Sequence, residues 1–444
     1  MSFLEYKYSD KRISPWGGMR LLQELYVRCG LREKIASLDL PKPGSNRGYQ
    51  ASDLIEGFIM SVILGAKRLS HTGSLRHDTV LPEIFGWSKG MASQSTFSRF
   101  FRKYSEQDSR RIFRTLQGWW FEQFSIDKLT IDIDSKVITR YGEQEGVAYG
   151  YSPKKIKGRG THHPILAFAA ELNMVVQARM RKGNSTDLSN FEEFFNEIVS
   201  VLPAERIGLW RLDAGFYGNA PLVLFESKGT KYIMGAHFKR GLVNRISKQT
   251  EWYPVLDKRQ KSTAYTTFYW KAAGWKKERR FIVIRRDKRV DPDARGKLLF
   301  PEIEEFESYT YTALVTNLEF SGDVIWGLYR KRGDCENRIK ELIYDYGIES
   351  FCLSTQAATD HVFRWIMIAY NLLALFKLEV LRKKKDIPTL FTLHFQCIAI
   401  GSYISKSARK TLIHLAARDD QKGFLEKLFR RTSELRPPFQ FSIA

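Results

Sequence analysis

The hydrophobic pattern of this 444-residue chain changes from helical to strand-like near Leu129, and this change most constrains the fold. Before it, apolar residues recur at helical spacing over residues 21–27, 54–64 and 112–124. After it, LTIDIDSKVI alternates between apolar and polar residues, which is typical of a strand with one buried face. The pattern therefore predicts a mostly helical N-terminal region followed by an α/β core.

The segments beyond Leu129 extend this prediction. HHPILAFAAEL and NMVVQARMR predict two more strands, residues 184–202 predict a helix, and RIGLWRLDAGF predicts a short strand that ends in a turn. Residues 238–301 are rich in charged and aromatic residues and contain the strand-like segments AYTTFYWKAA and ERRFIVIRRD. YTYTALVTNL then restores the earlier pattern, and helices follow over residues 323–377. This order predicts an α/β core that is split by a β-rich insertion.

The composition narrows the class of protein. A formal net charge of +22 implies a polyanionic partner, most often nucleic acid, with an anionic membrane surface as the alternative. The longest apolar stretch, residues 363–380, is interrupted by charged and polar residues, which favours a packed helix over a membrane span. The N-terminus lacks a signal-peptide core, and the four cysteines form no CxxC pair. We therefore expect a basic cytoplasmic protein that does not enter a membrane.

Two aspartates follow predicted buried strands. Asp134 ends the alternating strand, and Asp213 ends RIGLWRL immediately before Ala214 and Gly215. A carboxylate at the C-terminal end of a buried strand lies at the rim of an α/β sheet, where ligands usually bind. Asp132 points to the same face as Asp134 and is the competing candidate. Either aspartate alone is also explained as a turn cap.

The segment WGLYRKRGDCENRIKELIYDYG predicts one helix over residues 326–347. On such a helix Tyr329, Arg332, Glu336 and Lys340 fall within a sector of roughly 60°. A carboxylate between cations and a phenol suits a metal ion held against a phosphate, whereas an ordinary i,i+4 ion pair is the alternative. With the two aspartates, Glu336 would complete a set of hard oxygen ligands for Mg²⁺ or Mn²⁺.

Three blocks, IDIDSKVITRYGEQEGVAYGYSPKKIKGRGTHHPILAF, RLDAGFYG and YRKRGDCENRIKELIYDYG, resemble bacterial insertion-sequence DDE transposases. The likeness is closest to the group marked by Tyr-x2-Arg-x3-Glu-x6-Lys, and it covers roughly residues 129–377. The resemblance implies an α/β fold with a ribonuclease-H-like core, a helical N-terminal DNA-binding domain and a β-rich insertion before the last catalytic acid. The expected boundaries are 1–125 for the N-terminal domain, 126–236 and 306–382 for the core, 237–305 for the insertion, and 383–444 for a basic helical tail.

The resemblance also implies roles for individual residues. Asp134, Asp213 and Glu336 match a catalytic triad that holds two Mg²⁺ (or Mn²⁺) ions, and Tyr329 and Arg332 match the residues that hold the DNA end. The lysine of the signature falls at Ile343. Lys340, one turn earlier on the same face, is the substitute that we expect, with Arg338 a poorer one.

Several basic segments predict further DNA contacts. MASQSTFSRFFRKYS predicts a short helix capped by Ser93 or Ser95, whose outward Arg99 resembles a contact residue on the second helix of a helix-turn-helix. Basic runs, which together predict a phosphate-tracking surface, include Lys154, Lys155, Lys157 and Arg159; Arg179, Arg181 and Lys182; residues 276–289; and residues 382–385. Trp270, Trp275 and Trp326 either stack on an unpaired base or pack in the core. His162 and His163 are assigned no role.

The resemblance implies a cut-and-paste DNA transposase that binds terminal inverted repeats, cleaves a strand and transfers the freed 3′-OH. Double-stranded DNA, from the element's ends and from the target, is the expected partner. We also expect a homodimer in the synaptic complex and association with the bacterial nucleoid. The alternatives are a catalytically inactive DNA-binding protein derived from a transposase, which Ile343 supports, and a nuclease that cleaves without strand transfer.

Overall fold

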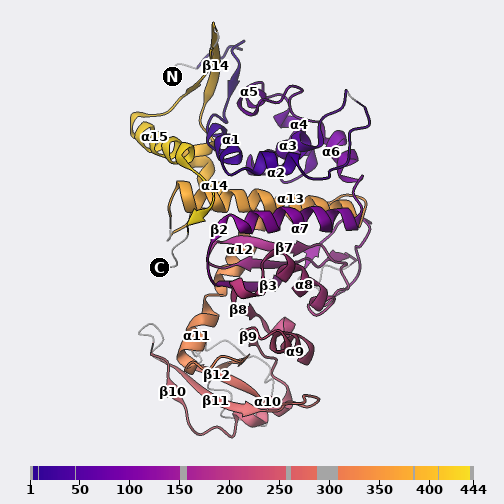
Figure 1. Cartoon of the computed structure of the whole chain (residues 1–444), viewed down its shortest axis with the longest axis vertical. Coiled ribbons are helices and arrows are strands. Elements are labelled where there is room, and N and C mark those ends of the chain that lie inside the picture. Colours follow the sequence, from indigo (N-terminus) through magenta and orange to yellow (C-terminus); the bar gives the residue numbers. More distant parts are fainter. Residues whose placement is uncertain are drawn as a thin grey trace.

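The computed structural model describes residues 4–8, 10–45, 47–150, 158–256, 262–287, 309–383, 386–408 and 410–440. The molecule is elongated, with a helical region at one end, a mixed sheet in the middle and the insertion at the other end (Figure 1). The mixed α/β architecture predicted from the change in periodicity is confirmed.

A nine-stranded sheet forms the centre of the protein, in the order β10-β11-β12-β13-β9-β8-β3-β6-β7. Strand β3 pairs in parallel with β8, which pairs in parallel with β9, whereas β6, β7 and the strands beyond β9 are antiparallel to their neighbours. The strands of the first half are β3 (Leu129–Ser135), β6 (Ile165–Ala169), β7 (Met174–Arg179), β8 (Ile207–Leu212) and β9 (Tyr232–Gly235). The first four lie within segments whose pattern predicted a strand, whereas β9 was not predicted.

The insertion continues this sheet. Its strands β10 (Tyr253–Pro254), β11 (Thr263–Trp270) and β12 (Arg279–Asp287) follow helix α10 (Arg240–Ile246). Strand β12 pairs along its whole length with β13 (Tyr309–Thr316), and β13 pairs with β9. The β-rich insertion is therefore joined to the core through shared backbone hydrogen bonds, an arrangement that periodicity alone does not reveal.

Seven helices, listed here from the described residues, form the N-terminal region: α1 (Met19–Arg28), α2 (Leu31–Ala36), α3 (Ala51–Ile63), α4 (Leu69–Leu75), α5 (Leu81–Phe85), α6 (Gln94–Phe101) and α7 (Glu106–Glu122). The predicted short helix is α6, and the Ser93 side chain caps it by accepting a hydrogen bond from the Thr96 N–H. Its three phenylalanines are buried, as an apolar face requires.

Helix α13 (Gln356–Leu375) lies between the sheet and the N-terminal helices, against α3, α7 and β7 (Figure 1). Among the described residues, only the segment Gln356–Val380 is long and apolar enough to span a membrane, and 94% of its apolar 18-residue stretch is buried inside the protein. Its polar residues have specific partners: Asn371 bonds both backbone groups of Val175 on the edge strand β7, and Arg364 pairs with Asp360. Buried polar groups paired in this way are those of a core helix.

The C-terminal segment differs from the mainly helical tail that we expected. Besides α14 (Leu390–Leu393) and α15 (Asp419–Glu434), it contains a hairpin of β14 (Ser402–Ser407) and β15 (Lys410–Leu415). Strand β14 also pairs with β1 (Ile13–Ser14), and α15 packs on α1. The C-terminal segment is therefore folded against the N-terminal region.

Candidate active site

The two predicted strand-end aspartates lie at one edge of the sheet. Because β3 and β8 are parallel and Ile133 is paired with Leu212, Asp134 and Asp213 follow adjacent positions on neighbouring strands. Asp134 accepts a hydrogen bond from the Ser135 N–H at 2.8 Å, and Asp213 accepts one from the Gly215 N–H at 3.0 Å. The sheet therefore places both carboxylates together, as the sequence predicted.

Arg332 joins the three predicted acids. Its Nη2 lies 3.2 Å from Asp134 Oδ2 and 3.7 Å from Asp213 Oδ2, and its Nη1 lies 4.0 Å from Glu336 Oε1. The exposed fraction of the side chain rises from 13% for Asp134 to 39% for Asp213 and 60% for Glu336. The three acids thus range from a nearly buried carboxylate, Asp134, to an exposed one, Glu336, and the Arg332 guanidinium lies between them.

Burial controls the acid–base properties of this cluster. It raises the pKa of Asp134 to about 6, because the favourable Arg332 charge does not fully offset desolvation and the neighbouring Asp213 and Glu336 charges. Burial likewise raises the pKa of Asp213. Desolvation opposes the charge on Arg332, but Asp134 and Asp213 outweigh it and raise the pKa of the guanidinium. Arg332 therefore stays charged and partly compensates the crowded carboxylates.

Asp132, the competing first acid, has a different environment. It is fully buried, and its two oxygens accept hydrogen bonds from Arg211 at 2.7 and 2.8 Å. Arg338 lies 3.5 Å from the same carboxylate. Because guanidinium groups inside the protein already engage both oxygens, Asp132 links β3, β8 and helix α12 (Gly333–Tyr344).

The predicted single helix over residues 326–347 is wrong in one respect. Helix α11 (Gly322–Arg330) ends and α12 (Gly333–Tyr344) begins on either side of a tight turn at Lys331 and Arg332. The Arg332 N–H bonds the Tyr329 carbonyl, and the Cys335 N–H bonds the Arg332 carbonyl, both in i to i+3 steps. The break places Arg332 at the N-terminus of α12, where its side chain reaches the aspartates.

Tyr329 and the lysine position of the signature have distinct surroundings. The Tyr329 hydroxyl lies 3.0 Å from the point where a Cβ on Gly235 would be, so it sits against the end of β9 beside Asp213. Lys340 is exposed on α12, one turn beyond Glu336. Ile343 packs against the hydrophobic core, which explains why an apolar residue is tolerated there.

Sequence reasoning missed a fourth carboxylate near the acids. Asp187, in the loop after β7, accepts a short hydrogen bond from the Ser135 hydroxyl and lies 3.4 Å from His163 Nε2. Its Oδ2 lies against Gly215, so that a larger residue at position 215 would displace the Asp187 carboxylate. Burial opposes ionisation of Asp187, but hydrogen bonds from His163 and Ser135 hold its pKa below the usual value. No local spacing signals this convergence, because it depends on the tertiary fold.

The donor set suits a hard divalent cation. Asp134 and Asp213 converge on a single nitrogen of Arg332, so a cation placed between them would meet carboxylate oxygens from both strands. In the described part of the chain, no group of three or more His, Cys, Asp or Glu side chains stands close enough to hold a metal ion together. A metal centre using all three acids therefore requires Arg332 and the exposed Glu336 to move.

The predicted basic contacts fall into three groups. Arg99 is exposed on α6, whereas Lys154, Lys155 and Lys157 lie outside the described residues. Arg179 and Arg181 were expected on a phosphate-tracking surface, but this is wrong: both are buried. Arg179 pairs with Glu193 and Glu197, and Arg181 bonds backbone carbonyls.

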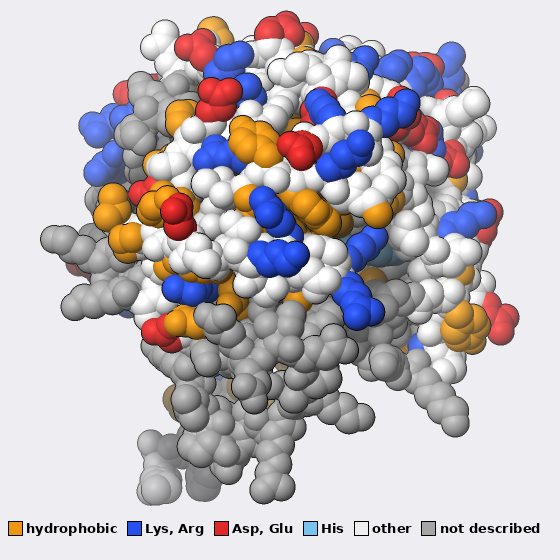
Figure 2. Space-filling model, turned by 90° about the horizontal axis from the view of Figure 1, so that it is seen from below, with side chains coloured by type: hydrophobic (Ala, Val, Ile, Leu, Met, Phe, Trp, Pro, Cys, Tyr) orange, Lys and Arg blue, Asp and Glu red, His pale blue; other side chains and the backbone are white. Residues whose placement is uncertain are grey.

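The insertion carries a basic face. Lys and Arg side chains occupy the middle of the surface seen from below, interleaved with hydrophobic side chains (Figure 2). The exposed cations of the described insertion and its approach are Lys239, Arg240, Arg245, Lys248, Lys271, Lys276, Lys277 and Arg286. Of the three predicted tryptophans, Trp275 and Trp326 are buried and Trp270 packs on Phe281, so all three contribute to packing.

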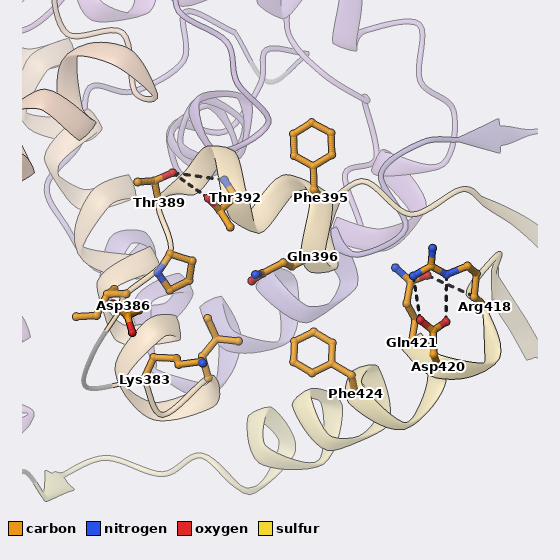
Figure 3. A pocket seen from close by; sticks show the side chains of 13 residues that line it. Lys383, Asp386, Thr389, Thr392, Phe395, Gln396, Arg418, Asp420, Gln421 and Phe424 are labelled. Atoms are coloured by element: carbon orange, nitrogen blue, oxygen red, sulfur yellow. Dashed lines mark hydrogen bonds and ion pairs between the residues drawn. The ribbon is translucent and has the colours of Figure 1, made fainter.

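A cavity of about 820 Å³ lies elsewhere, between α14, the turn that follows it and α15 (Figure 3). Gln396 and Phe424 lie near its centre, and Arg418 pairs with Asp420 at one end (Figure 3). Lys383, from the predicted basic run 382–385, lines it, but none of the predicted catalytic or metal-binding residues does.

One edge of the sheet thus gathers three acids, two that follow neighbouring strands and one from helix α12. The chain belongs to the family described as transposase DDE domain group 1, whose model matches residues 4–437. A search of curated proteins found no match to this sequence. Among solved structures, the chain is similar to a piggyBac transposase synaptic complex with hairpin DNA. The identity is 10% and the TM-score 0.43, over 84% of this chain and 77% of that chain.

Proposed function

We propose that this protein is an insertion-sequence DNA transposase that binds terminal inverted repeats and performs cut-and-paste transposition. The observation that carries this proposal is the convergence of Asp134, Asp213 and Glu336 around Arg332. Membership of the transposase DDE domain family gives that constellation its chemical meaning. The proposed subgroup is the bacterial one with the Tyr-x2-Arg-x3-Glu-x6-Lys signature, with Ile343 in place of its lysine.

The proposed core is ribonuclease-H-like. Its support is the strand order β7-β6-β3-β8-β9, in which β7, β6 and β3 pair in antiparallel and β3, β8 and β9 pair in parallel. The N-terminal helices and the basic insertion are proposed to bind double-stranded DNA at the inverted repeats. Joining two ends implies a homodimer in the synaptic complex, within the bacterial nucleoid.

The proposed roles follow from position. Asp134, Asp213 and Glu336 would hold two Mg²⁺ or Mn²⁺ ions, which when bound supply water activation and charge neutralisation at the phosphate. Arg332, released from the aspartates, would hold the phosphate of the DNA end through its two-pronged guanidinium. Tyr329, next to it on α11, would donate its hydroxyl to the same backbone. Lys340 would contact DNA further along α12.

The test is a supercoiled plasmid that carries the element's two ends, incubated with the protein and Mg²⁺. We expect linear backbone, excised element and products joined to target DNA, and we expect Glu336→Gln to lose all three by at least about 100-fold. Asp334→Asn, an exposed acid on the same helix, is the matched control and should retain activity. If Glu336→Gln cuts as well as the wild type, the catalytic assignment fails. Cutting without joined products would instead indicate a nuclease.

Ile343 favours a second candidate, a DNA-binding protein without catalytic activity. A partly buried apolar side chain that packs against the core stands where the signature places a cation. Binding of the terminal DNA by the wild type with no cleavage in Mg²⁺ or Mn²⁺ would establish this candidate.

A further inference from the structure

A pocket lined by two arginines lies between three segments of the chain, one of which begins three residues after Asp134. It has a volume of about 400 Å³, within the range of small-molecule sites. One wall is the segment after β3 that contains β4 (Ile138–Thr139), and it includes Val137, Arg140 and Gln144. Arg68, at the start of α4, and Glu349, in the loop between α12 and α13, line the other sides. The elements that carry Asp134 and Glu336 therefore both lead into this pocket.

Arg140 is the unusual residue of this pocket. Only 4% of it is exposed, yet among the described residues it forms no ion pair with a carboxylate. Its Nε donates to His162 Nδ1 at 2.9 Å and its Nη1 donates to the Glu349 carbonyl at 2.7 Å. Its Nη2 is buried and has no hydrogen-bond partner within the described chain. A buried guanidinium with one free donor is costly unless an anion or a water completes it.

Other groups around Arg140 also favour an anion. Arg68 is exposed at the rim, and Arg159 lies 5.1 Å from the centre of the Tyr141 ring at the same rim. The described lining therefore carries two guanidiniums against the single carboxylate of Glu349. Burial lowers the pKa of Arg140, and Cys352 and Glu349 only partly oppose this. An anion held by Arg140 and Arg68 would offset that desolvation.

We propose that Arg140 and Arg68 form a subsite that binds one backbone phosphate of the DNA next to the cleavage position. This inference rests on the proposed function, because DNA is the polyanion that would reach a pocket whose lining begins at Val137, three residues after Asp134. The phosphate oxygens accept hydrogen bonds from Arg140 Nη2 inside the pocket and from Arg68 at its rim. The subsite fixes the strand relative to the acids and takes no part in bond breaking.

The experiment measures binding of a duplex that carries the element's end and its flank, in Ca²⁺, by fluorescence anisotropy. Single phosphates around the cleavage position are replaced, one at a time, by neutral methylphosphonates. We expect one such position to weaken wild-type binding about tenfold. Arg140→Gln and Arg68→Gln should bind the unmodified duplex about tenfold more weakly than the wild type, and the plot of log binding constant against log salt concentration should be shallower by about 0.9. Replacing the sensitive phosphate by a methylphosphonate should weaken the binding of these two variants no further.

Controls distinguish loss of the subsite from loss of the folded structure and from failure of the proposed function. Arg68 is exposed, so Arg68→Gln tests the proposal even if Arg140→Gln proves unstable in thermal melting. Glu349→Gln removes the negative charge from the same pocket and should tighten binding. The proposal is overturned if the methylphosphonate scan is identical in the wild type and in Arg68→Gln, which would leave a structural water as the partner of Arg140. Wild-type protein that does not bind the terminal duplex would contradict the proposed function instead.

Discussion

Asp132 and Asp134 lie two residues apart on the same face of β3, yet their surroundings give them different roles. Asp132 is fully buried and held by Arg211 and Arg338, whereas Asp134 faces Arg332 at the sheet edge. A buried carboxylate between two guanidiniums stabilises the fold, and a carboxylate with a raised pKa beside other acids is typical of a functional site.

The two aspartates are therefore expected to respond differently to removal of charge. Asp132→Asn leaves two buried guanidiniums poorly paired and should lower the free energy of unfolding by about 3–5 kcal/mol. Asp134→Asn should change it by less than about 1 kcal/mol, because it removes a desolvated carboxylate and leaves Asp213 beside Arg332, but should abolish cleavage. Urea unfolding and plasmid cleavage of both variants check this. A stable Asp132→Asn protein that has lost cleavage would reverse the assignment.

Asp187 is expected to act through the residues that it holds. It bonds Ser135, next to Asp134, and its carboxylate lies against Gly215, two residues after Asp213. Loss of such supporting contacts commonly costs 10- to 100-fold in metal affinity or activity. We expect Asp187→Asn to raise the Mg²⁺ concentration needed for half-maximal cleavage by about tenfold, with partial recovery at saturating Mg²⁺. An unchanged Mg²⁺ dependence would exclude this role.

At the scale of elements, the hairpin β4 (Ile138–Thr139) and β5 (Thr161–His162) carries a pH-sensitive contact. Burial, with the Arg140 charge beside it, lowers the pKa of His162 from 6.5 to about 4. The folded protein therefore holds neutral His162 where the unfolded chain would bind a proton. The resulting stability is complete above pH 6.5 and is lost as the pH falls from 6.5 towards 4.

This loss is expected to reach up to about 3 kcal/mol, from 1.36 kcal/mol for each pKa unit. The measurement is the free energy of unfolding in urea at pH 7.5 and pH 4.5, for the wild type and for His162→Asn. Asparagine can still accept the Arg140 hydrogen bond but does not titrate, so its stability should fall less between the two pH values. Equal losses in both proteins would show that His162 is not responsible.

The strand elements were the most predictable part of the fold. Alternation of apolar and polar residues identified β3, although both faces of that central strand are largely buried instead of the expected one. An apolar run ending in aspartate identified β8, which is also largely buried. The break between α11 and α12 was not predictable. The helical pattern continues through Lys331 and Arg332, and the turn there positions Arg332 between acids from distant segments. Tertiary ion pairs of this kind have no local sequence signal.

For the whole molecule, the sequence gives the total charge but does not predict which of the cations are exposed. The +22 charge indicated a polyanionic partner, yet Arg179 and Arg181 turned out to be buried, whereas the basic face of the insertion is exposed. Burial depends on which acids the fold brings near, and Glu193 and Glu197 on α8 (Phe191–Val201) neutralise Arg179. Likewise, the order of segments predicted an insertion. It did not predict that the insertion joins the main sheet, which it does through the pairing of β12 with β13.

We propose that the fold brings three distant segments of the chain together to make one metal-dependent site. Asp213 tests it best, since it is partly exposed and follows β8 directly. Asp213→Cys replaces a hard oxygen ligand by a thiolate, which Mg²⁺ binds poorly and Mn²⁺ binds better. We predict that Asp213→Cys does not cleave the donor plasmid in Mg²⁺ and regains cleavage in Mn²⁺. Wild-type cleavage by Asp213→Cys in Mg²⁺ would contradict the account.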